Sequence, residues 1–194
     1  MERFYLEVPS ISRKADAIDY INENIQYKSD LNGTGGLDRF GDDYEGWLIK
    51  LEEDYSRVPT EERVPGRTYF LVRESDNRII GMINIRLSLN EKLRNYGGNI
   101  GYGIRPTERG NGYNKINLYL GLKVCFGCGI DTVLLDADLN NPASWKTMEA
   151  LGGIRIAEYY DENYKENIVK YSIDVKKSLE TYKDTYECFV SESR

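Results

Sequence analysis

The sequence predicts an α+β fold in which helices cover both faces of one mixed, mostly antiparallel sheet. Apolar residues recur with helical spacing in the first quarter of the chain, and from Thr68 they alternate with the period of about two that is typical of strands. Farther along, helical and strand-like runs take turns. With 194 residues, of which 40 % are hydrophobic and 30 % charged, the chain can build a core, which excludes wholesale disorder.

The first half supplies a strand, two helices and three further strands. Ser12 is a typical helix-opening residue, and the glycine-rich stretch 32–41 separates the two helices. The prolines of 58–66 end the helical part, the polar turn 75–78 joins a hairpin, and Pro106 stops the last strand. We expect these elements over residues 2–8, 12–27, 44–55, 68–74, 79–89 and 99–106.

The second half supplies a helix, a buried strand, a second helix and a closing hairpin, which brings the strands to seven. Asn141 is the predicted N-cap of the second helix, with Pro142 at its first position. These elements are expected over residues 114–126, 131–137, 141–151, 152–160 and 167–175. Residues 1–175 are then a single domain, and residues 176–194 a polar C-terminal tail or short helix.

The composition excludes several classes of protein. Lys and Arg number 26 against 32 Asp and Glu, a net charge of −6, so we expect no nucleic-acid partner and no membrane partner. There is no histidine, which excludes Ser-His-Asp and Cys-His catalysis and any imidazole metal site. The start MERFYLEV has no signal-peptide pattern, so a cytoplasmic location is expected. Cys125 and Cys128 lie within a helical pattern, which favours buried thiols over redox or metal chemistry, and no metal is predicted.

A glycine-rich turn between strand 99–106 and the next helix carries the clearest chemical signal. Gly110 and Gly112 precede a helix N-terminus, where unpaired amides and the positive end of the dipole suit a phosphate. Arg105, Arg109 and Lys115 add positive charge locally. A plain glycine-rich turn is the alternative for Gly-x-Gly taken by itself.

With these motifs, residues 68–174 resemble the GNAT superfamily of acyl-CoA-dependent N-acetyltransferases. The resemblance rests on TYFLV, INIR, LNEKL, GG-IGYGIRPTERGNGY and N-PAS-ALGG, which look like one branch of predicted acetyltransferases. It implies the seven-stranded fold of that superfamily, acetyl-CoA as co-substrate, a primary amine of a small molecule as acceptor, and a possible homodimer. The cofactor-binding residues that it implies are Gly103, Ile104, Arg109, Gly110, Asn111, Gly112, Tyr113, Asn141 and Ser144.

The chain departs from the superfamily pattern at positions that matter for chemistry. Thr107 stands where the phosphate loop usually begins with Gln or Arg, and Met148 stands where many members have a tyrosine acid. Relatives in the same branch have histidines near Leu87 and Asn99, and this chain has none. Catalytic detail therefore cannot be transferred intact.

Three residues are catalytic candidates. Asp136 could act as the base, since it shares with Asp138 one face of a strand at its ligand end, and a solvated or capping role is the alternative. Glu91 is a second carboxylate candidate. Tyr102 lies on the strand expected beside the acyl group, with plain packing as its alternative. Two further sets have either acceptor-side or purely structural roles: the loop 33–38, and Tyr159, Tyr160 and Tyr164.

Two other functions stay open at this point. Met148 and the missing histidines are compatible with a non-catalytic CoA-binding or regulatory module. A peptide or protein amine is an alternative acceptor, by fold analogy.

Overall fold

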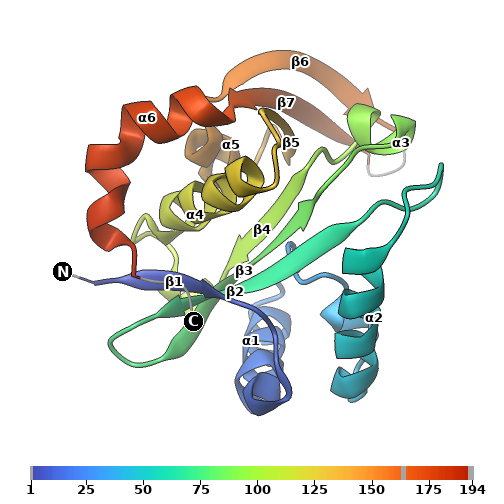
Figure 1. Ribbon diagram of the computed structural model, residues 1–194, viewed down its shortest axis with the longest axis vertical. Coiled ribbons are helices and arrows are strands. Elements are labelled where there is room, and N and C mark those ends of the chain that lie inside the picture. Colours follow the sequence, from blue (N-terminus) through green and yellow to red (C-terminus); the bar gives the residue numbers. More distant parts are fainter. Residues whose placement is uncertain (1, 163–164, 192–194) are drawn as a thin grey trace.

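Two antiparallel sheets form the centre of the molecule, seen in a computed structural model that describes residues 2–162 and 165–191 (Figure 1). The strands are β1 (Phe4–Glu7), β2 (Gly66–Arg73), β3 (Arg78–Arg86), β4 (Ile100–Ile104), β5 (Thr132–Asp138), β6 (Ile154–Asp161) and β7 (Glu166–Asp174). The α-helices are α1 (Lys14–Gln26), α2 (Tyr44–Ser56), α3 (Glu91–Asn95), α4 (Tyr113–Gly127), α5 (Pro142–Glu149) and α6 (Val175–Tyr186). Short 3-10 turns are η1 (Ile11–Arg13), η2 (Leu37–Arg39), η3 (Pro106–Glu108) and η4 (Glu187–Phe189).

The predicted α+β fold with seven strands is confirmed, and the strands are divided between two sheets rather than joined in one. The first sheet has the order β1-β2-β3-β4 and the second the order β5-β7-β6. All of these strand pairs are antiparallel, so the expected mixed character is reduced to one isolated parallel bridge between Phe4 and Val190.

The sheets meet at a short joint between β4 and β5, formed by Gly98, Asn99, Leu134 and Leu135. Gly98 and Leu135 form an isolated bridge, and the Asn99 amide donates to the Leu134 carbonyl at 2.6 Å. The Asn99 side chain replaces the next ladder bond, because its Oδ1 accepts from the Leu134 amide at 2.9 Å. Beyond the joint β5 pairs with β7, which leaves β4 as the last strand of the first sheet with one open edge.

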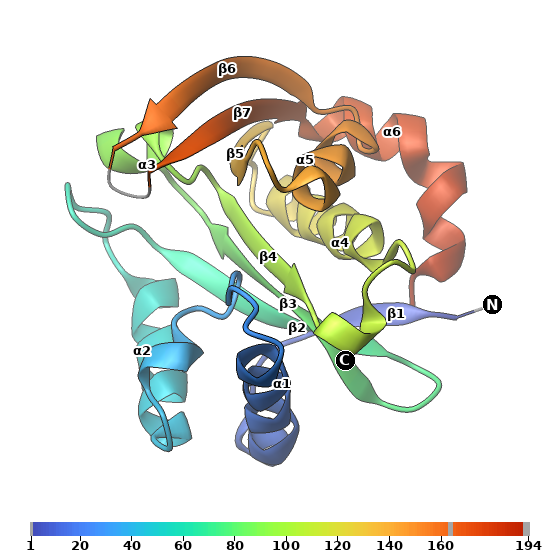
Figure 2. The same cartoon turned by 180° about the vertical axis from the view of Figure 1, so that it is seen from behind.

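Helices cover both faces of the first sheet, as predicted. Figure 2 shows α1 and α2 on one side and α4 on the other, with α6 lying outside α4. Trp47, Phe70 and Met82 belong to the core on the α1–α2 side, and Leu118, Leu122 and Ile83 to the core on the α4 side. Apolar residues therefore face both surfaces of β2 and β3, which explains why these strands have almost continuous apolar runs rather than strict alternation.

Two helices lie where the sequence predicted none or left the structure open. α3 is a single short helix opened by Asn90, whose Oδ1 accepts from the Leu93 amide at 2.9 Å. α6 occupies most of the predicted tail and starts at the N-cap Asp174. The Tyr186 ring of α6 packs 5.4 Å from the Tyr119 ring of α4, so this helix extends the main core.

Candidate active site

The turn that leads from β4 into α4 presents a run of free amides. Gly110 and Gly112 have φ angles of 83° and 79°, the left-handed region that favours glycine, and a Cβ at either position would have no atom within 4 Å. Gly112 is the N-cap of α4, and no side chain in the described part of the chain caps this end. Within the described residues, the amides from 110 to 114 make no hydrogen bond. The backbone is therefore open to an anion here.

The three cations expected beside this turn have different surroundings. Arg105 is buried, with its Nη1 2.7 Å from Asp19 and 2.8 Å from Glu23, so its charge is neutralised inside the fold. Arg109 donates to the Ile104 carbonyl at 3.0 Å and to Ser29 Oγ at 2.6 Å, and it forms no ion pair with any described carboxylate. Lys115 forms no ion pair with the described residues. Positive charge at the turn thus comes from Arg109 and Lys115, while Arg105 is structural.

Glu23 on α1 holds the start of the turn. Thr107, at the position where related loops begin with Gln or Arg, donates to Glu23 Oε1 from its amide at 3.0 Å and from its hydroxyl at 2.8 Å. Burial opposes the charge of Glu23, but the hydrogen bonds from Thr107 and Arg105 outweigh it and lower its pKa. Glu108 is fixed in turn between Arg73 and Arg78. The partners of Glu23 and Glu108 lie far from them in the chain, so these contacts leave no local pattern and were not predicted from the sequence.

The open edge of β4 exposes backbone groups of alternate residues. Arg105 donates to Ile80 of β3 and Arg86 donates to Asn99, and in an antiparallel ladder this alternation directs Gly101 and Gly103 toward β3. The N–H and C=O groups of Tyr102 and Ile104 point the other way, toward the open edge. Of the predicted pair Gly103 and Ile104, only Ile104 turns its peptide groups to that edge.

Tyr102 connects this edge to α5. Its hydroxyl donates to the Ser144 carbonyl at 3.1 Å and lies 3.2 Å from Ser144 Oγ. Burial raises the pKa of Tyr102 above its usual range, so the phenol stays protonated. The predicted cap of α5 is confirmed, since Asn141 Oδ1 accepts from the Ser144 amide at 3.2 Å. Met148, one turn farther along α5, is fully buried.

The loop between α1 and α2 covers the opposite face of β4. Gly33 has a φ of 75°, and a Cβ there would lie 2.7 Å from the Tyr102 Cα, so glycine permits this close approach. Lys50 and the Trp47 indole both donate to the Gly35 carbonyl, at 2.7 and 3.3 Å. The loop therefore packs against β4 at Gly33 and is hydrogen-bonded to α2 at Gly35.

Asp136 is committed to contacts that hold the segment after α3. Its Oδ2 accepts from the Gly97 amide at 2.7 Å and from the Tyr159 hydroxyl at 2.8 Å. The Lys170 ammonium lies 3.8 Å from Oδ1 and donates to the Arg94 and Asn95 carbonyls. Burial, together with this bond to Asp136, raises the pKa of Tyr159.

The remaining predicted residues have other surroundings. Glu91 lies in the first turn of α3 and lines an open cavity of about 810 Å³ between α3 and residues 59–64. The Tyr113 ring packs against Phe4, 4.7 Å between centroids. Asn111 donates back to the Glu108 carbonyl at 3.1 Å. Tyr160 is half exposed on β6, and Tyr164 lies outside the described residues.

Residues 2–162 and 165–191 contain neither a metal-ligand cluster nor a membrane-spanning helix. No group of three or more Cys, Asp or Glu side chains is arranged to hold a metal ion. No helix in this part of the chain is long and apolar enough to cross a membrane.

One protein-family model matches more than half of the chain. The model of the acetyltransferase (GNAT) family matches residues 37–153. No curated protein sequence matches the chain. Among solved structures, ribosomal-protein-S5-alanine acetyltransferase from Vibrio fischeri has a TM-score of 0.66 at 14 % identity, covering 90 % of this chain and 94 % of its own.

Two further structures are similar over comparable lengths. A spermidine N-acetyltransferase chimera from Vibrio cholerae and hSSAT has a TM-score of 0.62 at 14 % identity, covering 91 % of this chain and 98 % of its own. A GNAT-family acetyltransferase from Bacillus anthracis has a TM-score of 0.62 at 14 % identity, covering 90 % and 96 %. At these identities the likeness concerns the fold.

Proposed function

The chain belongs to the GNAT family of acetyltransferases, and we propose that it moves an acetyl group from acetyl-CoA to a primary amine of a small molecule. One observation carries the proposal: the free amides at residues 110–114 and the open edge of β4 follow one another along the chain. An anion-binding turn beside an unpaired strand suits a long ligand with a phosphate end and an amide-containing arm.

The residues present fit acetyl-CoA. Its pyrophosphate would be held by the amides that Gly110 and Gly112 leave uncovered, with Lys115 as a nearby cation. Its pantetheine amides would pair with the peptide groups of Tyr102 and with the amide of Ile104, in the way a further strand would, since the Ile104 carbonyl already accepts from Arg109. Asn141 and Ser144 would flank the arm from the start of α5.

Tyr102 is the chain's own group for the reaction. The amine nitrogen attacks the thioester carbon, the carbon–sulfur bond breaks, and the departing thiolate takes up a proton. The Tyr102 amide faces the open edge, where it could donate to the developing oxyanion, and its phenol, which donates to the Ser144 carbonyl in this structure, would have to turn to the departing thiolate. Met148 has no proton to give, so Tyr102 takes the role of acid in this proposal.

The proton that the amine loses needs a separate acceptor. Asp136 stays a predicted base, although its contacts with Gly97 and Tyr159 give it a structural role that competes with catalysis. Glu91 is exposed to solvent beside the 810 Å³ cavity and is the second predicted base. The chain has no histidine that could accept this proton, so water is the third acceptor.

The acceptor is proposed to be a small amine because of the cavity beside α3. Glu61 and Glu91 both line it, against one cation, Lys92, and the chain as a whole has a charge of −6. Carboxylates favour a cationic ligand. The neighbours named above act on spermidine in one case and on a ribosomal protein in the other, so a protein acceptor is the second candidate. A homodimer stays part of the proposal.

The test has two stages, binding and turnover. The melting temperature is measured with acetyl-CoA, free CoA and ATP, and ligand at 100 times its Kd should add about 2.7 kcal/mol of stability. A rise with both CoA species and none with ATP supports the cofactor assignment. Release of free CoA is then followed with a panel of amines and peptides. Amine-dependent release supports the transferase, and binding without release from any acceptor identifies the non-catalytic module instead.

The Tyr102 role is tested by Tyr102→Phe. Loss of a general acid lowers kcat by about a hundredfold while the Kd for acetyl-CoA stays within a factor of about three. Tyr44→Phe is the matched control, because Tyr44 on α2 is also buried and its hydroxyl also donates to a backbone carbonyl, that of Ser10. Equal kcat values for Tyr102→Phe and the wild type would remove Tyr102 from the chemistry.

A further inference from the structure

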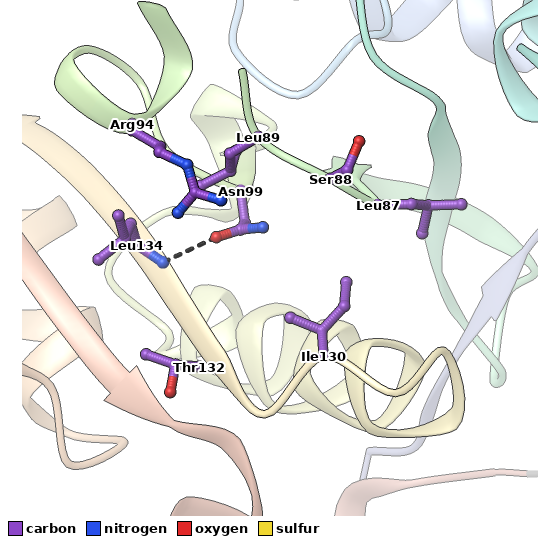
Figure 3. A pocket seen from close by; sticks show the side chains of 8 residues that line it. All are labelled: Leu87, Ser88, Leu89, Arg94, Asn99, Ile130, Thr132 and Leu134. Atoms are coloured by element: carbon purple, nitrogen blue, oxygen red, sulfur yellow. Dashed lines mark hydrogen bonds between the residues drawn. The ribbon is translucent and has the colours of Figure 1, made fainter. Parts of the chain in front are cut away.

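A second cavity lies at the other end of the joint from the predicted acetyl-CoA site. It has a volume of about 390 Å³ and is formed where β3 ends and β5 begins (Figure 3). The lining residues Thr132 and Leu134 lie in the first half of β5, whereas α5 follows the other end of this strand. The Asn99 side chain lines the cavity at the joint. Its Nδ2 donates to the Arg86 carbonyl, and its Oδ1 accepts from the Leu134 amide.

The walls of this cavity are mostly apolar. Its aliphatic lining comes from β5, from the residue pair that follows β3, and from the turn after α4: Leu134, Leu87, Leu89 and Ile130. Such a surface gains free energy by covering the apolar part of a ligand.

One charged residue, Arg94, lines the cavity, and it is exposed to solvent. Figure 3 shows the Arg94 side chain descending from α3, with its guanidinium beside Leu89, Asn99 and Leu134. Among the described residues, that guanidinium has no hydrogen bond and no ion pair. Asn99 Oδ1 does not accept from this guanidinium, because it already accepts from the Leu134 amide.

The base of Arg94 is held in place although α3 is short. The Lys170 ammonium donates to the carbonyls of Arg94 and Asn95 at 2.7 and 2.6 Å, and Lys170 is itself buried. The Arg94 amide donates to the Asn90 carbonyl at 3.0 Å. The guanidinium therefore extends from an anchored backbone over an apolar cavity.

We propose that this cavity is a second ligand site, which binds a small monocarboxylate with an apolar chain. A planar guanidinium matches a carboxylate through two parallel hydrogen bonds, and the aliphatic walls match an alkyl chain. A single cation suits one negative charge better than the two of a phosphate, and the buried Ser88 hydroxyl, which has no partner among the described residues, is a further donor in the cavity wall. The ligand touches Asn99 and Leu134, so it also braces the joint between the sheets.

The test uses hexanoate as the probe and hexanol as its neutral match, both without acetyl-CoA. Binding is measured by calorimetry, and its place by the amide shifts of Asn99 and Leu134 in NMR spectra. Hexanoate should bind and shift both amides, and Arg94→Gln should weaken it roughly tenfold or more. Arg3→Gln is the matched control, since Arg3 is an exposed arginine on the chain segment leading into β1.

A second variant keeps the charge and removes the space. Thr132→Trp fills the cavity from an exposed position, and it should abolish hexanoate binding with Arg94 intact. Hexanol binding as tightly as hexanoate, equal affinities in wild type and Arg94→Gln, or shifts confined to other residues would each overturn the proposal. None of these results depends on acetyl transfer, so the proposed function is tested separately.

Discussion

Two glycine-containing turns flank β4 and make opposite use of the same backbone freedom. Gly97 and Gly98 before the strand have φ angles of 96° and 60°, and Gly110 and Gly112 after it have 83° and 79°. In the first turn the protein itself takes up the polar groups. Asp136 accepts from the Gly97 amide, and Arg86 donates to the carbonyls of Gly97 and Gly98.

The second turn, which contains Gly110 and Gly112, differs from the first in this respect. Its amides have no partner within the described residues, and a Cβ at Gly110 or Gly112 would meet nothing. Glycine with a positive φ therefore does not mark a ligand site by itself. What distinguishes the two turns is whether buried side chains satisfy the backbone, because an unpaired amide retains its capacity to bind an anion.

The largest expected effect is on the first turn. A Cβ at Gly98 would overlap the Leu134 carbonyl, so Gly98→Ala should lower the free energy of unfolding by about 3 kcal/mol or more. Gly110→Ala, with the same change in open space, should lower it by only about 1 kcal/mol. Urea unfolding of both variants measures the difference, and equal losses would contradict the comparison.

Asp136→Asn tests whether the first turn is structural. The change removes the carboxylate from beside the buried Lys170 ammonium, so the free energy of unfolding should fall by about 2 kcal/mol. The activity of the folded fraction should stay within a factor of about three, as expected for a group that only holds the turn. A hundredfold loss of kcat with little loss of stability would instead support Asp136 as the base.

Gly110→Val tests the second turn. A branched side chain crowds the space beside the amides, so the affinity for acetyl-CoA should fall by about tenfold, or about 1.4 kcal/mol. Calorimetry measures the Kd, and Gly129→Val, another glycine with a positive φ of 74° and open surroundings, is the matched control. The same Kd in both variants would separate acetyl-CoA binding from this turn.

The last effect is absent at neutral pH and concerns the stability of the fold in alkaline solution. Burial raises the pKa of Tyr20, Tyr44, Tyr102 and Tyr119 above the usual range in the folded state. The unfolded chain loses these protons near pH 10, while the folded chain keeps them. The contribution is full below about pH 10 and is lost as the pH rises further, so the free energy of unfolding should decline there. Unfolding measured between pH 8 and 11 checks the sign.

Much of the fold was predictable because its signals are local. The hairpin of β2 and β3, the cap at Asn141 and the stop at Pro106 each depend on residues that are close together in the chain. The division into two sheets was not predictable, because it depends on a side-chain bond from Asn99 to Leu134 across 35 positions. α3 was too short to give a periodic signal.

The candidate site also combines features that the sequence predicts with features that it does not. The turn at Gly110 and Gly112 could be located from spacing, since it needs only a strand, two glycines and a helix start. Glu23 and its bonds to Thr107 could not, because they join α1 to residues 84 positions away. Arg105 was expected to add charge at the turn, and only its burial beside Asp19 and Glu23 reveals its structural role.

The most direct test is an NMR titration that follows the backbone amides of both turns as acetyl-CoA is added. If the second turn holds the phosphates, the amides of Gly110, Asn111, Gly112 and Tyr113 should show the largest shifts. The amides of Gly97 and Gly98, which belong to the satisfied turn, should move little. Large shifts at Gly97 and Gly98 with none at Gly110–Tyr113 would contradict the account.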